Sequence, residues 1–466
     1  MFNYSLVSDK AEKSNYWNEY AQTMSREELD ELHLKRLKNL LVYAYENNSF
    51  YKELYDRYRV NVYEIETLQD FKNKIPLTDK PMIQPSQSED NLYGDNIATN
   101  NSFIAAHYAT SGTTGKPMNE AWEDYAIWRV GESWCPAFWS VGIRPGDSFY
   151  FAYDFGQFAG FWSAYYGVIR FGGKTISGAG TGVTSEKRIQ LILDLKPTVL
   201  VATPTYALHL SNVARKMGID TSSTSIKFYV GAGEPGPASV PRIRKRIEEA
   251  WGCRCCEVLG ISEIPTVSPT CHELGGFHEH EMHQYSWVRD LNSGKEATEG
   301  KIGERIVTSL SNYTTIWINY RSHDLVRASY DCGCGSTWMF YEGGVLGRTD
   351  NMTIYKGTNI YQAAVENLVS SFPEASDYFQ LIITRKDDED QMRVRIEPSP
   401  YVKEDQYANL SQKISLKIKQ DIGVSLPVDI VPIESLPRFE VKTKRVIDDR
   451  PKEFKTELAR KVKTFE

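Results

Sequence analysis

Amphipathic and apolar stretches alternate along the first two thirds of the chain and predict helices interleaved with buried strands. Ser25 followed by Glu28 has the spacing of a capping box, and leucines then recur at helical spacing, so we expect a helix that ends near Asn47. Further along, SEKRIQLILDLKP (residues 185–197) predicts a helix that stops at its proline. The β-branched run TVLVATP (198–204) follows at once and predicts a buried strand.

The same alternation continues to about residue 263. SIKFYVGAGE (225–234) alternates apolar and polar residues into a glycine turn, VPRIRKRIEEAWG (240–252) predicts a helix closed by Gly252, and CCEVLGISE (255–263) predicts another short strand. Strands that alternate with helices in this way indicate a parallel, helix-covered sheet. Ligands of such sheets bind where the strands end in loops.

The pattern changes to shorter units near residue 350. Residues 378–398 predict two strands around the charged turn KDDEDQ, and a helix follows from about Glu404. A chain of 466 residues is too long for one ordinary core. We therefore predict an α/β fold with two domains. Residues 1–349 would form a large N-terminal domain with helix-covered mixed or parallel sheets, and residues 350–466 a small, mobile C-terminal α+β domain.

Composition and charge argue against a nucleic-acid-binding, membrane or secreted protein. The formal net charge of −7 argues against nucleic acid as the main partner, because proteins that bind nucleic acid usually carry a basic surface. The sequence contains no run of about 18 apolar residues that could span a bilayer. Its N-terminal residues lack an apolar stretch of signal-peptide length. We therefore expect a cytoplasmic enzyme without a membrane or nucleic-acid partner. Seven cysteines in such a chain indicate thiols or metal ligands before disulfides.

HYATSGTTGKP, residues 107–117, is the first candidate for chemistry. Its glycines and hydroxyl groups are suited to binding phosphate, because glycine lets backbone N–H groups approach an anion closely. Gly112 and Gly115 are only three residues apart and a proline follows Lys116, so the common phosphate-loop spacing is not met. Taken alone, the segment could equally be an ordinary surface turn.

Six further motifs accompany this loop: ATPTY (202–206), GAGEP (231–235), GISE (260–263), YRSHD (320–324), GRTD (347–350) and PRFEVKTKR (437–445). In this order and spacing the set resembles the adenylate-forming acyl-CoA synthetases and, more closely, the phenylacetate-CoA ligase family. The segments YWNEY and RLKNLLVYAYENNSFYKELY near the N-terminus extend the resemblance over nearly the whole chain. It implies an enzyme that uses ATP and Mg²⁺ to activate an aromatic or arylacetic acid as acyl-AMP, and then transfers the acyl group to CoA.

The resemblance also implies a set of nucleotide contacts. The loop would close over the β- and γ-phosphates, with Thr113 counted among the catalytic residues. Glu263 would bind Mg²⁺, a hard cation that prefers carboxylate oxygens, and would also be catalytic. Asp324 would accept hydrogen bonds from the ribose hydroxyls. The implied nucleotide-binding residues are Thr110, Ser111, Gly112, Thr113, Thr114, Gly115, Lys116, Gly233, Glu234, Pro235, Gly260, Ile261, Ser262, Asp324 and Arg348.

The small domain would contribute a catalytic lysine. The resemblance assigns this role to Lys442, which would contact both the carboxylate and the α-phosphate, where a cation stabilises developing charge. Lys444 is a competing candidate, although alignment on Leu436-Pro437-Arg438 favours Lys442. Asp350 would be the hinge about which the small domain rotates.

A metal site is predicted from the cysteine pattern. Cys271, His278, Cys332 and Cys334 make a Cys₃His set, which is typical of a closed, structural zinc site and also occurs in the resembling family. The rival ligands His272, His280 and His283 stay open, as does the alternative that the cysteines are simply reduced. We interpret Cys255 and Cys256 as small buried hydrophobes, and Cys135 has no evident partner.

Residues 149–167 are dense in aromatic side chains, and the equivalent segment of the resembling family lines the acyl pocket. We expect its substrate-binding residues to be Tyr153, Phe158, Phe161 and Trp162. Most aromatic rings in this segment will belong to the core. Those that line a pocket would favour a flat, apolar acid.

Two departures from the family keep other functions open. Leu259 stands where the family usually has a tyrosine that stacks on adenine, and Val441 stands where it usually has glycine, which restricts the loop that carries the lysine. The alternatives are an adenylate-forming enzyme that acts on another acceptor, such as a deazaflavin cofactor, an amine or a carrier protein, and a catalytically silent homologue. A homodimer is also expected, because a dimer is a common outcome for soluble enzymes.

Overall fold

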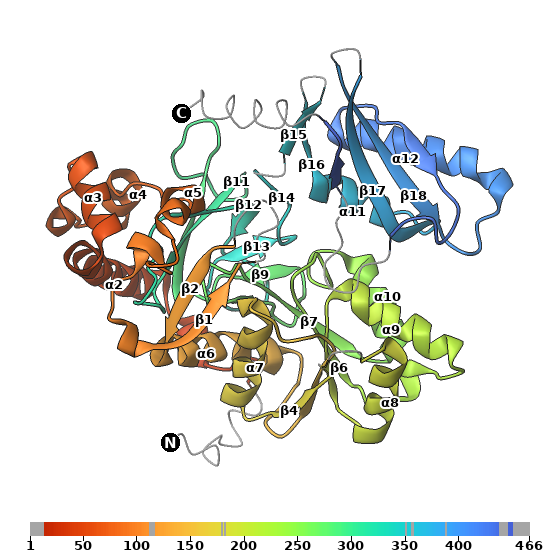
Figure 1. Ribbon diagram of the computed structural model, residues 1–466, viewed down its shortest axis with the longest axis horizontal. Helices are drawn as coiled ribbons and strands as arrows, with labels where there is room; N and C mark the ends of the chain where they lie inside the picture. Colours follow the sequence, from red (N-terminus) through yellow and green to blue (C-terminus); the bar gives the residue numbers. More distant parts are fainter. Residues whose placement is uncertain are drawn as a thin grey trace. The chain divides into compact units, whose positions relative to one another are not determined.

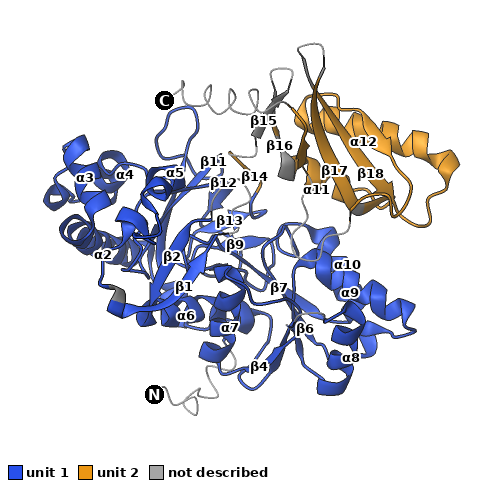
Figure 2. Cartoon of the chain, viewed as in Figure 1, with its two compact units in different colours: residues 1–345 blue, residues 346–466 orange. Residues whose placement is uncertain are grey.

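The computed structural model describes residues 14–110, 117–178, 180, 183–349, 352–355, 358–386, 389–437 and 446–450. The chain divides into two compact units, Met1–Val345 and Leu346–Glu466 (Figure 2). Residue 350, where the sequence analysis placed the domain boundary and the hinge, lies outside the described residues. Both units combine helices with sheets, so the predicted α/β class with a separate C-terminal α+β part is confirmed.

The first unit contains the predicted parallel sheet, whose strand order is β4-β3-β5-β6-β7-β8. Figure 1 labels β4, β6 and β7 of this sheet. All neighbours are parallel except β7 and β8, which pair antiparallel. The strands are β3 (Ser148–Phe151), β4 (Lys174–Ser177), β5 (Val199–Val201), β6 (Phe228–Gly231), β7 (Arg254–Leu259) and β8 (Ser268–Pro269).

Helices connect these strands and cover both faces of the sheet. On one face Leu200 and Tyr229 pack against α8, α9 and α10, and on the other Val201 and Val230 pack against α6 and α7. Cys255 and Cys256 point to opposite faces, and both are fully buried, as expected of small hydrophobes. The helices are α6 (Asp124–Ser140), α7 (Ala159–Phe171), α8 (Ser185–Leu195), α9 (Pro204–Lys216) and α10 (Pro241–Trp251).

Local sequence fixes the ends of several helices as expected. Ser25 and Glu28 form the predicted capping box at the start of α2, and α2 ends at Asn47. Gly252 closes α10 with φ of +62°, a left-handed conformation that glycine adopts without strain. The N-terminal helices are α1 (Glu19–Thr23), α2 (Arg26–Asn47), α3 (Ser49–Tyr58), α4 (Leu68–Lys74) and α5 (Lys80–Ile83).

A second sheet of the first unit is largely antiparallel, with the order β10-β11-β12-β13-β9. Together with the N-terminal helices it builds a core that contains Leu37, Tyr51, Ile306 and Ile318. A separate antiparallel hairpin pairs β1 (Ile104–Ala109) with β2 (Asn119–Glu123), on either side of the predicted phosphate loop. The strands of the sheet are β9 (Gly276–His278), β10 (Gln284–Arg289), β11 (Ile302–Ser309), β12 (Tyr320–Ser329) and β13 (Phe340–Glu342).

The second unit has its own apolar core, which includes Leu381, Val394 and Ile414. Its main sheet has the order β19-β18-β17-β20, and the predicted strand pair around the charged turn is β17 and β18. The predicted helix begins three residues later than expected, at Tyr407, after one 3₁₀ turn. The elements are β14 (Gly347–Arg348), β15 (Met352–Tyr355), β16 (Thr358–Tyr361), α11 (Gln362–Ser370), β17 (Ala375–Lys386), β18 (Glu389–Pro398), α12 (Tyr407–Ile422), β19 (Val428–Ile430) and β20 (Val446–Asp448).

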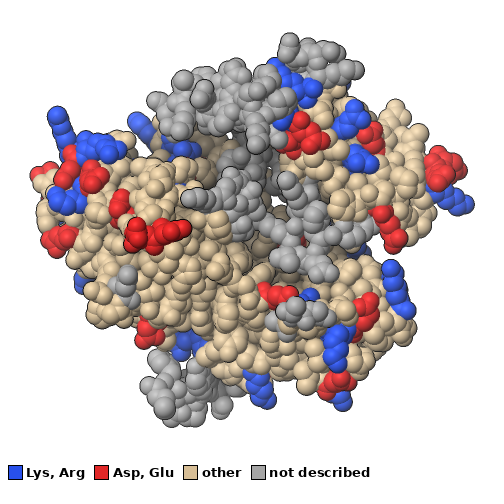
Figure 3. Space-filling model, viewed as in Figure 1, with Lys and Arg blue, Asp and Glu red and all other residues tan. Residues whose placement is uncertain are grey.

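Charged side chains of both signs are interspersed over the visible surface (Figure 3). Among the described helices, none is both long and apolar enough to cross a membrane.

Candidate active site

Three predicted motifs follow the carboxyl ends of neighbouring parallel strands. ATPTY follows β5, GAGEP begins at the end of β6 and GISE follows β7. One Glu234 carboxylate oxygen accepts hydrogen bonds from the backbone N–H and the hydroxyl of Thr205, at 3.2 and 2.7 Å. The first two motifs therefore meet at one edge of the sheet, the position at which such sheets bind their ligands.

Lys80 connects the predicted phosphate loop to the predicted magnesium carboxylate. Thr110 is buried where β1 enters the loop, and its hydroxyl accepts hydrogen bonds from Lys80 Nζ at 2.8 Å and from the Met118 N–H at 3.0 Å. The same Nζ lies 3.7 Å from a carboxylate oxygen of Glu263. Sequence reasoning missed Lys80, because a lysine before Pro81 in a short helix carries no local signal of function.

Glu120 is a second residue that sequence reasoning missed. It lies on β2 with 1% of its surface exposed, and it accepts hydrogen bonds from the Thr315 hydroxyl at 2.7 Å and from the Trp317 indole at 3.2 Å. Burial raises the pKa of Glu120 well above its usual range, and the nearby charge of Glu263 raises it further. The strand that leaves the phosphate loop is thereby joined to residues 315–317, which lead into β12.

Asp324, the predicted ribose-binding residue, is buried on β12, and its N–H donates to the Ser322 hydroxyl at 3.1 Å. The start of β12 pairs with the segment that carries Lys80. The Thr78 N–H donates to the Asn319 carbonyl at 2.9 Å, and the Arg321 N–H donates to the Thr78 carbonyl at 2.9 Å. The predicted ribose carboxylate and Lys80 therefore lie on two segments that are hydrogen-bonded to each other.

Glu257 holds the loop after GAGEP through hydrogen bonds to its backbone. Its carboxylate accepts a hydrogen bond from the Ala238 N–H at 2.6 Å and another from the Gly236 N–H. A Cβ atom at Gly236 would lie 2.8 Å from Pro204 and 3.0 Å from the Glu257 carboxyl group, so only glycine fits between them. Burial raises the pKa of Glu257 to about 8.

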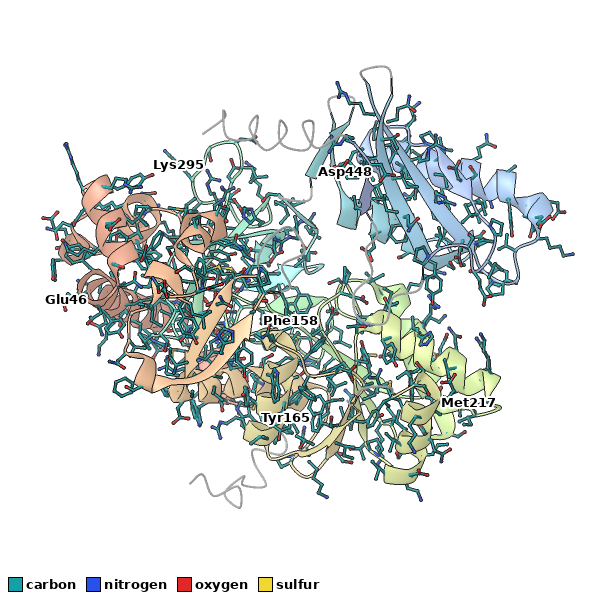
Figure 4. The ribbon with its side chains drawn as sticks, viewed as in Figure 1. Glu46, Phe158, Tyr165, Met217, Lys295 and Asp448 are labelled. Atoms are coloured by element: carbon teal, nitrogen blue, oxygen red, sulfur yellow. The ribbon has the colours of Figure 1, made fainter. Side chains whose placement is uncertain are left out.

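The four predicted acyl-pocket residues form one aromatic cluster around the start of α7. Tyr153 stacks on Phe161 with ring centroids 4.2 Å apart, Phe158 lies 5.4 Å from Phe161, and Phe155 joins Tyr153 to Trp162. Phe158 and Tyr165, at the start and in the middle of this region, are labelled in Figure 4. The cluster lies next to the end of β1, because the Ala109 N–H donates to the Gln157 carbonyl at 2.9 Å.

The predicted zinc ligands come together. The ligand atoms of Cys271, His278, Cys332 and Cys334 all lie within 4.8 Å of one another, a spread that a single tetrahedral zinc ion would span. Nδ1 of His278 lies 3.1 Å from the Trp338 carbonyl oxygen, which orients the ring so that Nε2 faces the sulfurs.

The rival histidines lie outside this group. His272 contacts Glu273 at 3.4 Å, and His280 and His283 stack on each other with centroids 4.5 Å apart.

The N-terminal segment rests on the loop that carries two of these cysteines. The Tyr16 hydroxyl donates to the Cys334 carbonyl at 2.7 Å, and the Trp338 indole donates to the Ala21 carbonyl at 2.8 Å. The Gln22 carbonyl also accepts the Thr337 N–H at 2.9 Å. The cysteine loop therefore holds the chain just before α2 in place.

Comparison with known proteins agrees with this arrangement. Phenylacetate-coenzyme A ligases from Thermus thermophilus and Escherichia coli are 32% and 31% identical to this chain, over 92% of it and over 98% and 97% of their own lengths. The chain belongs to the phenylacetate-CoA ligase family. The model of the AMP-binding enzyme C-terminal domain matches residues 357–450, which lie in the second unit.

Solved structures of adenylate-forming enzymes share the fold of this family member. A 2-hydroxyisobutyryl-CoA ligase in complex with 2-HIB-AMP superposes with a TM-score of 0.86 at 28% identity, over 97% of this chain and 96% of that chain. An anthranilate-CoA ligase in complex with anthranoyl-AMP, at 16% identity and a TM-score of 0.56, shares the fold alone.

Several predicted site residues of this ligase-family chain lie outside the described residues. These are, in the loop, Ser111, Gly112, Thr113, Thr114, Gly115 and Lys116; the predicted hinge residue Asp350; and, in the small domain, Val441, Lys442 and Lys444. Arg348 lies on β14 in the second unit. Leu259, at the end of β7, packs in the apolar cluster that contains Ala238, close to the loop held by Glu257.

Glu257 makes stability depend on pH in a defined direction. In the unfolded chain a glutamate titrates near its ordinary value of about 4.3, whereas folding raises the pKa of Glu257 to about 8. The contribution of Glu257 to stability is therefore complete below pH of about 4.3 and is lost as pH rises through about 8. We expect the urea midpoint of Glu257→Gln, which keeps a neutral acceptor, to fall less between pH 5.5 and 8 than the wild-type midpoint.

Glu342→Gln is the matched control, because this glutamate is exposed and pairs with Arg327, which is itself exposed. It should retain the wild-type dependence on pH. The same slope in Glu257→Gln and the wild type would contradict the role given to Glu257.

Proposed function

We propose that the protein is an ATP-dependent acid–thiol ligase that activates an aromatic or arylacetic carboxylic acid as acyl-AMP and transfers the acyl group to CoA, giving acyl-CoA, AMP and pyrophosphate. The observation that carries the proposal is the match to phenylacetate-coenzyme A ligases at 32% and 31% identity over 92% of the chain. The meeting of Thr110, Lys80 and Glu263 supports it, because it joins the loop and the carboxylate that ATP activation requires.

In the first step an oxygen of the substrate carboxylate forms a bond to the α-phosphorus of ATP, and the bond from that phosphorus to pyrophosphate breaks. Two anions must approach each other, so the site has to neutralise charge and hold the reactants in line. Lys80 supplies a cation at the start of the phosphate loop. Glu263 would hold Mg²⁺, which neutralises charge on phosphate oxygens when bound.

In the second step the sulfur of CoA attacks the acyl carbon, AMP leaves with the electron pair of the broken C–O bond, and the thiol gives up its proton. The nucleotide must stay bound through both steps. Asp324 would hold the ribose hydroxyls, while the loop of Gly233, Glu234 and Pro235, supported by Glu257, would pack near the base. Leu259 would leave the base without a stacking ring from this position.

The identity of the acid rests on two separate observations. The cluster of Tyr153, Phe158, Phe161 and Trp162 favours a flat aromatic acid. The similarity to a 2-hydroxyisobutyryl-CoA ligase favours a small branched hydroxy acid as the second candidate. We place the enzyme in the cytoplasm, where a site of reduced cysteines is stable, and propose a homodimer because twofold dimers are the commonest oligomers of soluble enzymes.

A panel of phenylacetate, benzoate, 2-hydroxyisobutyrate and a medium-chain fatty acid, assayed for AMP release with and without CoA, tests the function. We expect the fastest release with an aryl or arylacetic acid, and only when CoA is present. Exchange of pyrophosphate into ATP without CoA-dependent AMP release would instead indicate another acceptor, such as an amine, a deazaflavin cofactor or a carrier protein. Absence of ATP binding by calorimetry would indicate a catalytically silent homologue.

Lys442 is the proposed catalytic lysine of the small domain. We expect Lys442→Ala to slow acyl-AMP formation by roughly 10²-fold or more, because it removes a cation from the developing negative charge. Reaction of preformed acyl-AMP with CoA should stay within about twofold of the wild type, since that step does not use this cation. Rapid-quench measurement of each half-reaction separates the two, and Lys444→Ala is the control that should spare both. Equal losses in both half-reactions of Lys442→Ala would refute the assignment.

We propose that Cys271, His278, Cys332 and Cys334 hold a structural Zn²⁺, which would contribute folding energy and take no part in catalysis. Elemental analysis of the purified protein should find about one zinc per chain. We expect Cys332→Ser to lose the metal and to melt at a lower temperature, whereas His272→Gln, which changes a rival ligand outside the group, should keep it. Wild-type protein without zinc, or zinc lost from His272→Gln alone, would contradict this ligand set.

A further inference from the structure

His323 lies between two carboxylates that come from different parts of the first unit. Its Nε2 is 3.2 Å from a carboxylate oxygen of Asp79, and its Nδ1 is 3.3 Å from a carboxylate oxygen of Glu304. A neutral imidazole has only one N–H, whereas the imidazolium has two. Both contacts are therefore satisfied together only by the charged ring.

Glu304 fixes one end of this link. It is completely buried on β11 and also contacts Arg321 at 3.1 Å and Arg289 at 3.5 Å. Burial alone would raise its pKa, but the contacts with His323 and Arg321 more than offset this, so the pKa of Glu304 lies below its ordinary value. The carboxylate stays ionised and anchors the ring of His323 from the interior.

Asp79 is the other end, and it directly precedes Lys80. It occupies the N-cap position of α5, where an aspartate usually accepts a hydrogen bond from its own helix, yet its side chain makes no such bond. Its carboxylate contacts His323 instead. The contact with His323 on β12 thus fixes the start of α5, and with it the position of Lys80.

The backbone at His323 supports a functional reading of these contacts. Its φ of +63° lies in the left-handed region, which a residue with a Cβ adopts at a cost in energy. The next residue is Asp324. The surrounding contacts hold a strained residue directly before the proposed ribose carboxylate.

We infer that His323 is a positioning residue of the nucleotide site, which sets Lys80 and Asp324 at a fixed separation through its paired contacts with Asp79 and Glu304. The inference rests on the proposed function, in which Lys80 serves the phosphates and Asp324 the ribose. A rigid link between these two groups lowers the entropy that ATP binding must remove from them. His323 itself need not touch the nucleotide.

Two single variants, their double variant and one control test the link. His323→Asn removes the cation but keeps a residue that tolerates the left-handed backbone, and Asp79→Asn removes the partner charge. Arg327→Gln is the matched control, because Arg327 lies on β12 with His323 and the variant breaks only an exposed ion pair with Glu342. Calorimetry with MgATP gives the affinity, and pyrophosphate exchange gives KM for ATP and for the acid separately.

We expect His323→Asn and Asp79→Asn each to weaken ATP binding and raise KM for ATP by about tenfold, with KM for the acid within about twofold. The double variant should be no worse than either single variant, because both remove the same link. Arg327→Gln should bind ATP as the wild type does. Unchanged ATP affinity in both single variants, or additive losses in the double variant, would overturn the inference and leave His323 as a stabilising residue only.

The proposed function and this inference can fail separately. Wild-type protein that binds MgATP but exchanges no pyrophosphate with any acid of the panel would refute the ligase activity, and calorimetry on the variants would still decide the role of His323. Wild-type protein that does not bind MgATP would overturn both.

Discussion

The parallel register of β5, β6 and β7 is the constraint on which the site depends. Parallel neighbours end at the same edge of a sheet, so three motifs that are about 30 residues apart in sequence are delivered to one place. Apolar side chains on both faces of these strands fix the register, because a slip by one residue would exchange the two faces. The side chains at this edge are therefore positioned by apolar core residues that do not themselves contact the ligand.

Near the site the protein buries three carboxyl groups and matches each one to its partners. Glu257 accepts backbone N–H groups, Glu304 accepts two arginines and a histidine, and Glu120 accepts a hydroxyl and an indole. A buried carboxyl group without a hydrogen-bond partner would cost free energy. Positions of these segments that break the pairing are therefore unfavourable. The loops of the site are thereby held by contacts that are both strong and directional.

Much of the fold followed from local sequence. Ser25 with Glu28, the glycine at 252 and the apolar run at 198–204 act on their immediate neighbours, and the elements that they predicted are present. The family resemblance likewise proposed Thr110 and Glu263, which the structure brings to the same lysine. Residues whose roles depend on distant partners were missed: Lys80 meets Thr110 across 30 positions, and His323 meets Asp79 across 244. Periodicity and motif spacing carry no information about which such residues will be adjacent.

The contact between the N-terminal segment and the cysteine loop bears on how the chain folds as it leaves the ribosome. Tyr16 and Ala21 find their partners 318 and 317 positions later, at Cys334 and Trp338. Residues 16–21 must therefore wait until residues 334–338 have been synthesised. Contacts of such long sequence separation form late, and apolar surface that waits for them is exposed to aggregation. A nascent chain of this enzyme would thus depend on the later cysteine loop to complete a part that emerged much earlier.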